Sequence, residues 1–253
     1  MLRIDLNADV GESFGTYTLG NDAGLMNSIT SANIAAGFHA GDPSVLRATI
    51  RLAKSRGVAI GAHPGFPDLV GFGRRELNVT PREAEDFVLY QVAAVAGVAA
   101  AEGVKLQHVK PHGALFNMAV RNAPLAAAIA RAVAVFDRSL IIFGLSGAEI
   151  LHAGRAAGLR AAAEVFADRA YEPDGSLTPR TRPGSVIHDA ATVVARALRM
   201  VKDGTVVAVD GTVIRLDADT ICVHGDTPGS DDLAAKLRAG LEEAGVAVKA
   251  IGR

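Results

Sequence analysis

Short apolar runs alternate with longer amphipathic segments along almost the whole chain. The short runs predict strands, and the longer segments, in which apolar positions recur every three or four residues, predict helices. Predicted strands cover residues 2–8, 30–36, 57–62, 104–110, 139–144, 160–166 and 219–223. Predicted helices cover residues 43–55, 81–102, 122–135, 147–157, 188–202 and 229–244. This alternation indicates parallel strands joined by right-handed crossovers.

Several predicted helices begin and end at residues that favour those positions. Thr80 is followed by Pro81 and Glu83, which is typical of a capped helix start, and Asp42 before Pro43 repeats the pattern. Glycine follows three helices, where a left-handed backbone conformation is favoured, at Gly57, Gly103 and Gly158. These signals support the predicted helix boundaries.

Polar side chains gather on one face of the first strand and at the ends of later strands. In LRIDLNAD, residues Asp5, Asn7 and Asp9 share one face, because side chains in a strand alternate. Burying such groups is unfavourable unless they pair, bind a metal or take part in chemistry. We therefore expect an active site at the strand ends, with the deeper Asp5 supporting its neighbours through a buried ion pair.

Two architectures fit the alternating pattern: an open doubly wound sheet and a closed barrel. Polar ends on nearly every strand favour the barrel, since an open sheet concentrates its site at one switch point. We predict a single domain over residues 1–253, an α/β fold with a (β/α) barrel of about seven parallel strands. The Asp210-Gly211 turn predicts a small β-hairpin insertion near 204–217. The proline-containing loop 167–184 is expected to be a lid or binding loop.

Composition and charge exclude several classes of protein. The net charge of −1 gives no basic footprint for nucleic acid. Cys222 is the only cysteine, so no internal disulfide can form, which suits a reducing compartment. The sequence holds no continuous apolar run long enough for a membrane span, and the Ala-rich stretch after Tyr90 is interpreted as a buried helix face. A cytoplasmic globular protein is expected.

Four histidines follow apolar runs and stand next to glycine or proline, and we expect them to share one site: His39, His63, His112 and His224. An imidazole serves either as a proton shuttle or as a metal ligand. Asp9 or Glu12 is a candidate general base or metal ligand. The spacing does not match a standard zinc motif. A divalent metal is therefore allowed but not required, and its ligands would come from Asp9, His39, His63 and His112.

Cationic residues near these histidines are candidates for binding anions. Lys110 is either a counter-ion for Asp5 or Asp9, or a cation that holds a substrate carboxylate or polarises a carbonyl. Arg74 and Arg75 stand in a glycine-rich loop, which suits either an anion site or a solvent-exposed basic turn. Arg180 and Arg182, in the proline-containing loop, could close over the same anion. No phosphate-loop motif occurs in the sequence.

Taken together, these motifs resemble one known family. The strings DLNADVGESFG, SANIAAGFHAGDP, GAHPGFPDLVGFGRR, VKPHGALFN and EVFADRAY are similar to those of the LamB/YcsF family, and the resemblance runs from Asp5 to at least Asp226. It implies a barrel of the glycoside hydrolase/deacetylase type and the activity of the 5-oxoprolinase A component. That activity opens 5-oxo-L-proline to L-glutamate with ATP as co-substrate and with partner subunits B and C. The family commonly has cysteine where this chain has Ala36, which we interpret as tolerated packing.

The resemblance and the residues together predict a site. We expect catalysis by acid–base groups and one cation, namely Asp9, His39, His63, Lys110 and His112. We expect the substrate and its anionic groups to be bound by Asn7, Glu12, Asp42, Arg74, Arg75, Glu164 and Arg180. Two other functions remain open: a metal-dependent deacetylase or amidohydrolase that acts alone, and a non-catalytic subunit that presents the substrate. Homo-oligomerisation also remains open.

Overall fold

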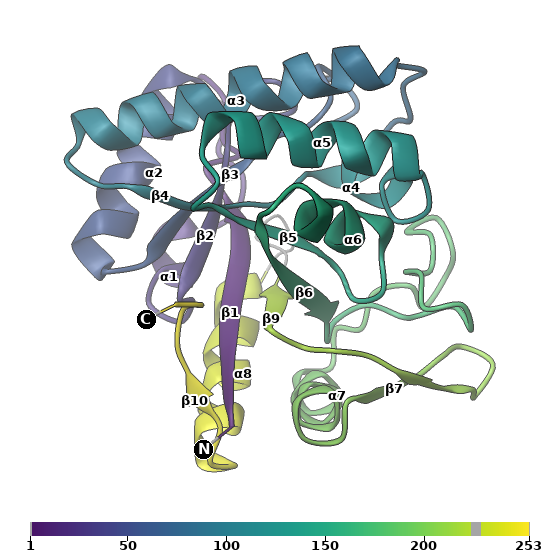
Figure 1. Cartoon of the computed structure of the whole chain (residues 1–253). Helices are drawn as coiled ribbons and strands as arrows, with labels where there is room; N and C mark the ends of the chain where they lie inside the picture. Colours follow the sequence, from purple (N-terminus) through teal and green to yellow (C-terminus); the bar gives the residue numbers. More distant parts are fainter. Residues whose placement is uncertain (1, 224–228, 253) are drawn as a thin grey trace.

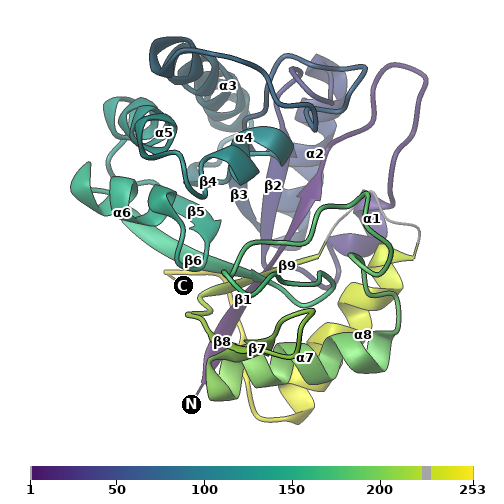
Figure 2. The same ribbon diagram turned by 90° about the vertical axis from the view of Figure 1, so that its right-hand side faces the viewer.

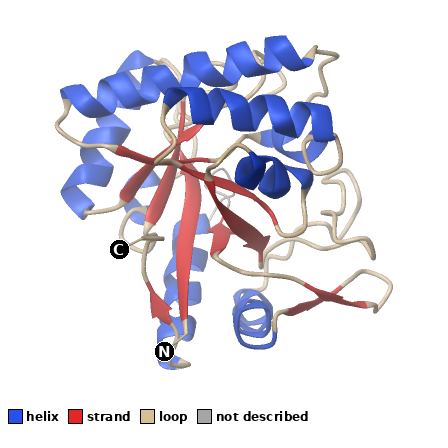
Figure 3. Cartoon of the chain, viewed as in Figure 1, coloured by secondary structure: helices blue, strands red, loops and turns tan. Residues whose placement is uncertain are grey.

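The computed structural model of the chain describes residues 2–223 and 229–252. Seven parallel strands form a closed barrel: β1 (Arg3–Val10), β2 (Ser31–Ala35), β3 (Ala59–His63), β4 (Leu106–Val109), β5 (Ile141–Leu145), β6 (Arg160–Phe166) and β9 (Thr220–Val223). Each strand pairs with the next in this order, and β9 pairs with β1 to complete the ring. The strands lie in the middle of the molecule (Figures 1 and 3). The predicted barrel of about seven strands is confirmed.

Six longer helices surround the barrel: α2 (Pro43–Arg56), α3 (Pro81–Ala101), α5 (Ala123–Phe136), α6 (Glu149–Ala156), α7 (Ala190–Asp203) and α8 (Ser230–Glu243). Figure 2 shows that α3 and α5 lie side by side, as do α7 and α8, and both pairs are in contact. The main hydrophobic core lies between the outward faces of the strands and these helices. Its residues are mostly Ala, Val, Leu and Ile, as the low aromatic content predicts.

The predicted start signals act as expected in two helices. The Thr80 side chain accepts a hydrogen bond from the Glu83 backbone, and the Glu83 carboxylate accepts one from the Thr80 backbone. Asp42 accepts hydrogen bonds from the backbones of Ser44 and Val45 at the start of α2. Because a capped end leaves fewer backbone donors unpaired, these residues determine where α2 and α3 begin.

Helix α3 is long and apolar enough to span a membrane by length and composition alone. In the fold, however, its residues Val88, Val92, Val95 and Ala99 are fully buried, and the helix contacts α5, β3 and β4. The prediction of a buried helix face after Tyr90 is confirmed.

Three short elements were not expected: α1 (Asp22–Leu25), α4 (Gly113–Met118) and β10 (Ala247–Val248). They have four, six and two residues, too few for a repeating apolar pattern. Strand β10 pairs with the beginning of β1 outside the closed ring. These elements depend on neighbouring parts of the fold rather than on local sequence.

The predicted hairpin is present as β7 (Thr205–Val207) and β8 (Val213–Arg215), which pair antiparallel. Gly211 in its turn has a φ of 90°, a conformation that residues with a Cβ rarely adopt. The Val209 backbone donates to the carbonyl of Tyr171, so the hairpin contacts the loop that follows β6. The hairpin insertion is confirmed at the predicted position.

The interior of the barrel is polar toward the carboxyl ends of its strands. Asn7 lies in register with Cys222 of β9, and Asp9 with Asn33 of β2. All four side chains are buried on the inward face. A small separate apolar cluster fills another part of the interior, and it consists of Ile141, Phe143 and Ala162. The strand register therefore brings distant polar residues together inside the barrel.

Candidate functional site

A cavity of about 460 Å³ opens at the carboxyl ends of the barrel strands. Side chains from three strand ends form its floor, namely Asp9, His63, Lys110 and His112. The loop after β3 contributes Arg74, and the loop after β6 contributes Arg169, Leu177, Thr178, Pro179, Arg180 and Thr181. The loop after β6, which the sequence predicts to be a lid or binding loop, therefore forms one wall of the cavity.

Lys110 is the central cation of the cavity floor. Its Nζ lies 2.9 Å from Asp9 Oδ1 and 3.0 Å from Glu164 Oε1, and it donates to Cys222 Sγ at 2.9 Å. Burial acts to lower the pKa of Lys110, but the attraction of the Asp9 and Glu164 carboxylates outweighs it and raises the pKa well above its usual value. Lys110 therefore stays cationic at neutral pH. Lys110 is a counter-ion for Asp9, as one interpretation of the sequence predicts, and it also faces the cavity.

Two asparagines determine how the carboxylates around Lys110 are oriented. Asn33 Nδ2 donates to both Asn7 Oδ1 and Asp9 Oδ1, at 2.7 and 2.9 Å. Asn7 Nδ2 donates to Glu164 Oε1 at 2.9 Å. His108 Nε2 lies 2.8 Å from Asn33 Oδ1. Because an amide oxygen only accepts hydrogen bonds, the Nε2–H group of His108 is the donor. Asn7 thus orients Glu164 rather than lining the cavity. Sequence reasoning missed Asn33, although its position opposite Asp9 on an alternating strand was a usable signal.

Asp5 is held differently from what the sequence predicts. Three hydroxyl groups donate to its carboxyl group, from Thr30, Ser31 and Thr220 at 2.7, 2.7 and 2.6 Å. Burial raises the pKa of Asp5 despite these hydrogen bonds. Among the residues that the structure describes, no cation pairs with Asp5, so the expected buried ion pair is wrong and hydroxyl groups take the place of a cation. The supporting role remains, because Thr220 also accepts a hydrogen bond from Asn7.

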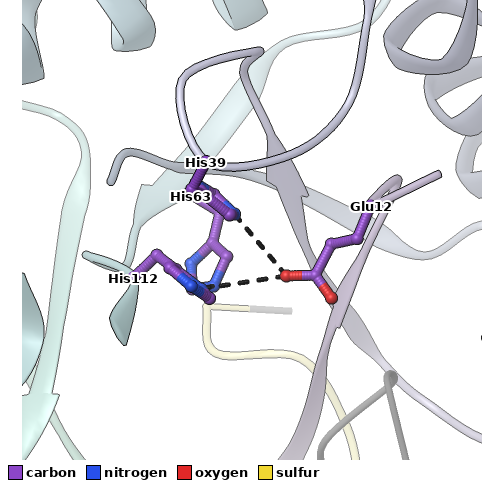
Figure 4. Close-up of side chains that lie close together, drawn as sticks. All are labelled: Glu12, His39, His63 and His112. Carbon is purple, nitrogen blue, oxygen red and sulfur yellow. Dashed lines mark hydrogen bonds and ion pairs between the residues drawn. The ribbon is translucent and has the colours of Figure 1, made fainter. Parts of the chain in front are cut away.

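Three of the predicted histidines meet beside the cavity. The rings of His39 and His112 are stacked with centroids 3.7 Å apart, and His63 lies edge-on to both. Glu12 joins them from the segment after β1, with Oε1 3.5 Å from His39 Nε2 and 3.8 Å from His112 Nδ1 (Figure 4). One ligand atom from each of these four residues lies within 4.8 Å of the other three. We call Glu12, His39, His63 and His112 the histidine cluster.

Two imidazoles of the cluster point their lone pairs at each other. His63 Nδ1 lies 2.7 Å from the carbonyl oxygen of Lys110, and His112 Nε2 lies 2.8 Å from that of Phe72. Because a carbonyl only accepts, each of these nitrogens carries the hydrogen and donates it. The remaining His63 Nε2 and His112 Nδ1 are then both acceptors, and they are only 3.0 Å apart. Such a pair requires a proton or a metal ion between the two nitrogens.

The pKa shifts favour a cation other than a proton. Burial, followed by the neighbouring imidazoles, lowers the pKa of His112 well below its usual value. Burial likewise lowers the pKa of His39, and neither of its ring nitrogens has a hydrogen-bond partner among the described residues. Neutral imidazoles with a carboxylate are ligands that suit a divalent ion such as Zn²⁺, and carbonyl groups behind the rings are typical of metal-binding histidines. The cluster therefore fits a metal, with Glu12 in the position expected for Asp9.

Several predicted anion-binding residues lie apart from the cavity. Arg75 forms an ion pair with Asp68, whose pKa this hydrogen bond lowers. Asp42 caps α2 and also accepts a hydrogen bond from the Gly15 backbone at 2.9 Å. Arg182 pairs with Glu172. The structure therefore brings Arg74 and Arg180 to the cavity but not Arg75, Arg182 or Asp42.

Two further predictions concern His224 and Ala36. His224, which was expected to join the other histidines, lies outside the described residues. Ala36 is partly buried and packs against the main core, in agreement with its interpretation as a packing position.

The fold and the site together define a parallel β/α barrel with a polar site at the carboxyl ends of its strands. A buried lysine, its two carboxylate partners and the histidine cluster form this site. The chain belongs to the LamB/YcsF family, whose model matches residues 4–253. The family resemblance seen in the sequence is confirmed.

Named relatives and solved structures agree with this membership. The A component of 5-oxoprolinase from Tolumonas auensis is 55% identical over 99% of this chain and 100% of its own length. The protein of the same name from Pyrococcus furiosus is 52% identical over 99% of this chain and 98% of its own length. The crystal structure of a lactam utilization protein from Thermus thermophilus has a TM-score of 0.93 and 48% identity, and the match covers 99% of this chain and 100% of that one.

A more distant structure shares only the fold. A polysaccharide deacetylase from Bacillus cereus matches with a TM-score of 0.55 and 12% identity, over 100% of this chain and 93% of that one. This similarity agrees with the barrel type that the family resemblance implied.

Proposed function

We propose that this chain is the A component of a 5-oxoprolinase, which opens the lactam ring of 5-oxo-L-proline to give L-glutamate. The observation that carries the proposal is identity above 50%, over nearly the full length of both chains, to relatives that bear this name. The near-identical fold of a lactam utilization protein supports a lactam substrate. The domain that acts is the one barrel over residues 1–253.

The residues of the cavity floor supply the groups that lactam opening needs. Water attack on the ring carbonyl needs a base, the leaving nitrogen needs a proton, and the developing oxyanion needs a positive charge. Lys110 faces the cavity as a cation and stabilises negative charge on the carbonyl oxygen. Asp9, which also lines the cavity, accepts the proton of the attacking water. His63 Nε2 lies 3.4 Å from Asp9 Oδ1, so this proton passes through the His63–His112 pair to the leaving nitrogen.

The other predicted residues support these groups. His39 and Glu12 orient the ring of His112 by stacking and by charge. Glu164 balances Lys110. A divalent ion bound to the histidine cluster would supply a Lewis acid next to the substrate.

ATP and two partner subunits complete the proposal. Opening a lactam is unfavourable enough to be coupled to ATP hydrolysis, with ADP and phosphate as products. The sequence has no phosphate-loop motif, and the relatives are named as subunits. Both observations support a heteromeric complex in which subunits B and C take part in the ATP chemistry. We propose that this complex is cytoplasmic.

The direct test is ADP release that depends on 5-oxo-L-proline. We expect release when this chain is combined with subunits B and C, and none from this chain alone. Asp9→Asn should abolish release, because the amide cannot accept a proton, while the exposed Asp203→Asn serves as a control and should change nothing. Wild-type release from Asp9→Asn would contradict the assigned role of Asp9.

The histidine cluster favours a second candidate function, a metal-dependent amidohydrolase or deacetylase that acts alone. This function predicts hydrolysis of an amide by the isolated chain without ATP, and loss of that activity after treatment with a chelator. An inactive isolated chain that gains activity only with the partner subunits and ATP would exclude it.

A further inference from the structure

Arg169 was not among the residues expected to bind anions, yet it lies in the wall of the cavity. It follows the carboxyl end of β6, three residues after Phe166. The residue is only 5% exposed, which is unusual for an arginine. Its burial at the edge of a cavity calls for an explanation.

The guanidinium of Arg169 is held in place by the loop around it. Nε donates to the carbonyl of Ser185 at 3.1 Å, and Nη2 donates to the carbonyl of Thr178 at 2.6 Å. A guanidinium has five N–H donors, so both hydrogens of Nη1 and one of Nη2 remain for another partner. Neither Arg169 nor Arg180 has a carboxylate within salt-bridge distance among the described residues. The side chain is therefore oriented in advance, with donors left over.

A second arginine lines the same cavity as Arg169. Arg180 lines the same cavity from the same loop, and its side chain makes no hydrogen bond within the described part of the chain. Both arginines line one cavity, and burial followed by repulsion from Arg180 lowers the pKa of Arg169 to about 10. Attraction to Asp168 offsets only part of this effect. An anion between the two arginines would relieve the repulsion.

The neighbouring walls indicate the kind of anion. Phe116, Phe166 and Leu177 line the same cavity and provide apolar surface for a small ring. Lys110, whose Nζ lies 5.4 Å from the centre of the Phe166 ring, provides a second and separate positive charge. A ligand that carries a carbonyl oxygen, apolar ring carbons and an anionic group matches these three features.

We propose that Arg169 and Arg180 form the subsite that binds the carboxylate of a small cyclic amide, while Lys110 faces the carbonyl of its ring. The pair makes the site selective for lactams that carry a carboxylate. Planar guanidinium groups match the two coplanar oxygens of a carboxylate, and a preoriented arginine loses little freedom when it binds. This inference rests on the proposed function for the identity of the substrate, 5-oxo-L-proline.

The test compares three ligands by calorimetry on the full chain: 5-oxo-L-proline, 2-pyrrolidinone, which is the same ring without the carboxylate, and inorganic phosphate. Arg169→Met should weaken the binding of 5-oxo-L-proline by about ten- to a hundredfold, because a hydrogen-bonded charge is lost. Binding of 2-pyrrolidinone should not change. The control is Arg182→Met in the same loop, which removes a surface ion pair with Glu172 and should leave all three affinities unaltered.

Several results would overturn the proposal. Equal binding of 5-oxo-L-proline to the wild type and to Arg169→Met would do so, as would no binding to the wild type. Equal weakening of both lactams would mean that Arg169 only holds the loop. Weakening of phosphate alone would assign the arginines to a phosphate group instead.

A second variant and a binding readout separate the effect on the subsite from effects on folding and on catalysis. If Arg169→Met does not fold, as judged by its melting curve, Arg180→Met replaces it, since the Arg180 side chain is half-buried and the same loss is expected. Because the measurement is binding and not turnover, carboxylate-selective binding without 5-oxoprolinase activity in the complex would contradict the proposed function and leave the arginine subsite standing.

Discussion

At the scale of single residues, the site depends on matched charges inside a closed barrel. Lys110 is 3% exposed and contacts the carboxylates of Asp9 and Glu164 together. A buried ion pair gives little net stability, but removing one partner leaves the other charge without compensation. The two carboxylates that orient Lys110 toward the cavity therefore make the stability of the fold sensitive to the loss of the Lys110 charge.

We predict that Lys110→Met abolishes turnover in the complex and lowers the free energy of unfolding by roughly 3 kcal/mol, because two buried carboxylates lose their cation. Chemical denaturation measures the change. Adding Glu164→Gln to this variant should recover part of the stability but none of the activity. Lys202→Met, at an exposed position of α7, is the control. A stability equal to that of the wild type would show that Asp9 and Glu164 do not need Lys110.

The low pKa of the buried His108 makes the stability of the fold depend on pH. Burial, followed by repulsion from Lys110 and His63, lowers its pKa to about 3, whereas an unfolded histidine has a pKa of about 6.5. The unfolded state therefore binds the proton first, so this contribution is complete above pH ~6.5 and is lost as the pH falls toward ~3. By pH 5 the loss is about 2 kcal/mol.

The measurement compares the wild type with His108→Asn at pH 7 and at pH 5. The stability advantage of the wild type should shrink by about 2 kcal/mol between the two values. His152→Asn, at an exposed position of α6, is the matched control. A constant difference between wild type and His108→Asn would mean that His108 does not stay neutral in the folded chain.

At the scale of elements, the His108 side chain of β4 limits which residue can occupy position 61 of β3. A Cβ added at Gly61 would lie 2.1 Å from Nε2 of His108. The His108 ring cannot retreat, because it stacks on Phe143 with centroids 4.3 Å apart and is fully buried. Glycine at this position of β3 is therefore required by packing.

We predict that Gly61→Ala lowers the free energy of unfolding by about 1–3 kcal/mol, as overpacking of a core does. Gly97→Ala is the matched control, because a Cβ at this exposed position of α3 meets no atom within 4 Å. Helical preference makes that change neutral or stabilising by up to about 1 kcal/mol. Thermal and chemical unfolding of both variants test the contrast, and a stable Gly61→Ala would mean that His108 can move.

At the scale of the whole molecule, the histidine cluster joins segments that are far apart in the sequence. Its ligand atoms come from the segments after β1, β2 and β4 and from the end of β3. Only the closed barrel brings them within 4.8 Å of one another. A metal bound there would stabilise the folded chain relative to the unfolded chain.

We therefore predict that Zn²⁺ raises the melting temperature of the isolated chain. At a free metal concentration about 100-fold above Kd, the gain is about 2.7 kcal/mol. Glu12→Gln and His39→Asn should each remove most of this gain, whereas His152→Asn should keep it. A wild-type chain whose melting curve does not respond to Zn²⁺, Mn²⁺ or Co²⁺ would contradict a metal at the cluster.

The sequence by itself determined the elements and most of the candidate site. Strand and helix periods, helix caps such as Thr80 and the Asp210-Gly211 turn act over a few residues, so they can be read locally. Alternation on β1 and histidines after apolar runs likewise led to Asp9, His39, His63 and His112.

Only the tertiary structure decided which of these groups meet. Glu12 rather than Asp9 completes the histidine cluster, Asp9 pairs with Lys110, and Arg75 pairs with Asp68 away from the cavity. Arg169 became visible as a cavity residue only through its burial. The physical reason is that burial, pKa shifts and distances between charges arise from contacts between strands and loops that are far apart in the chain, and local patterns do not encode these contacts.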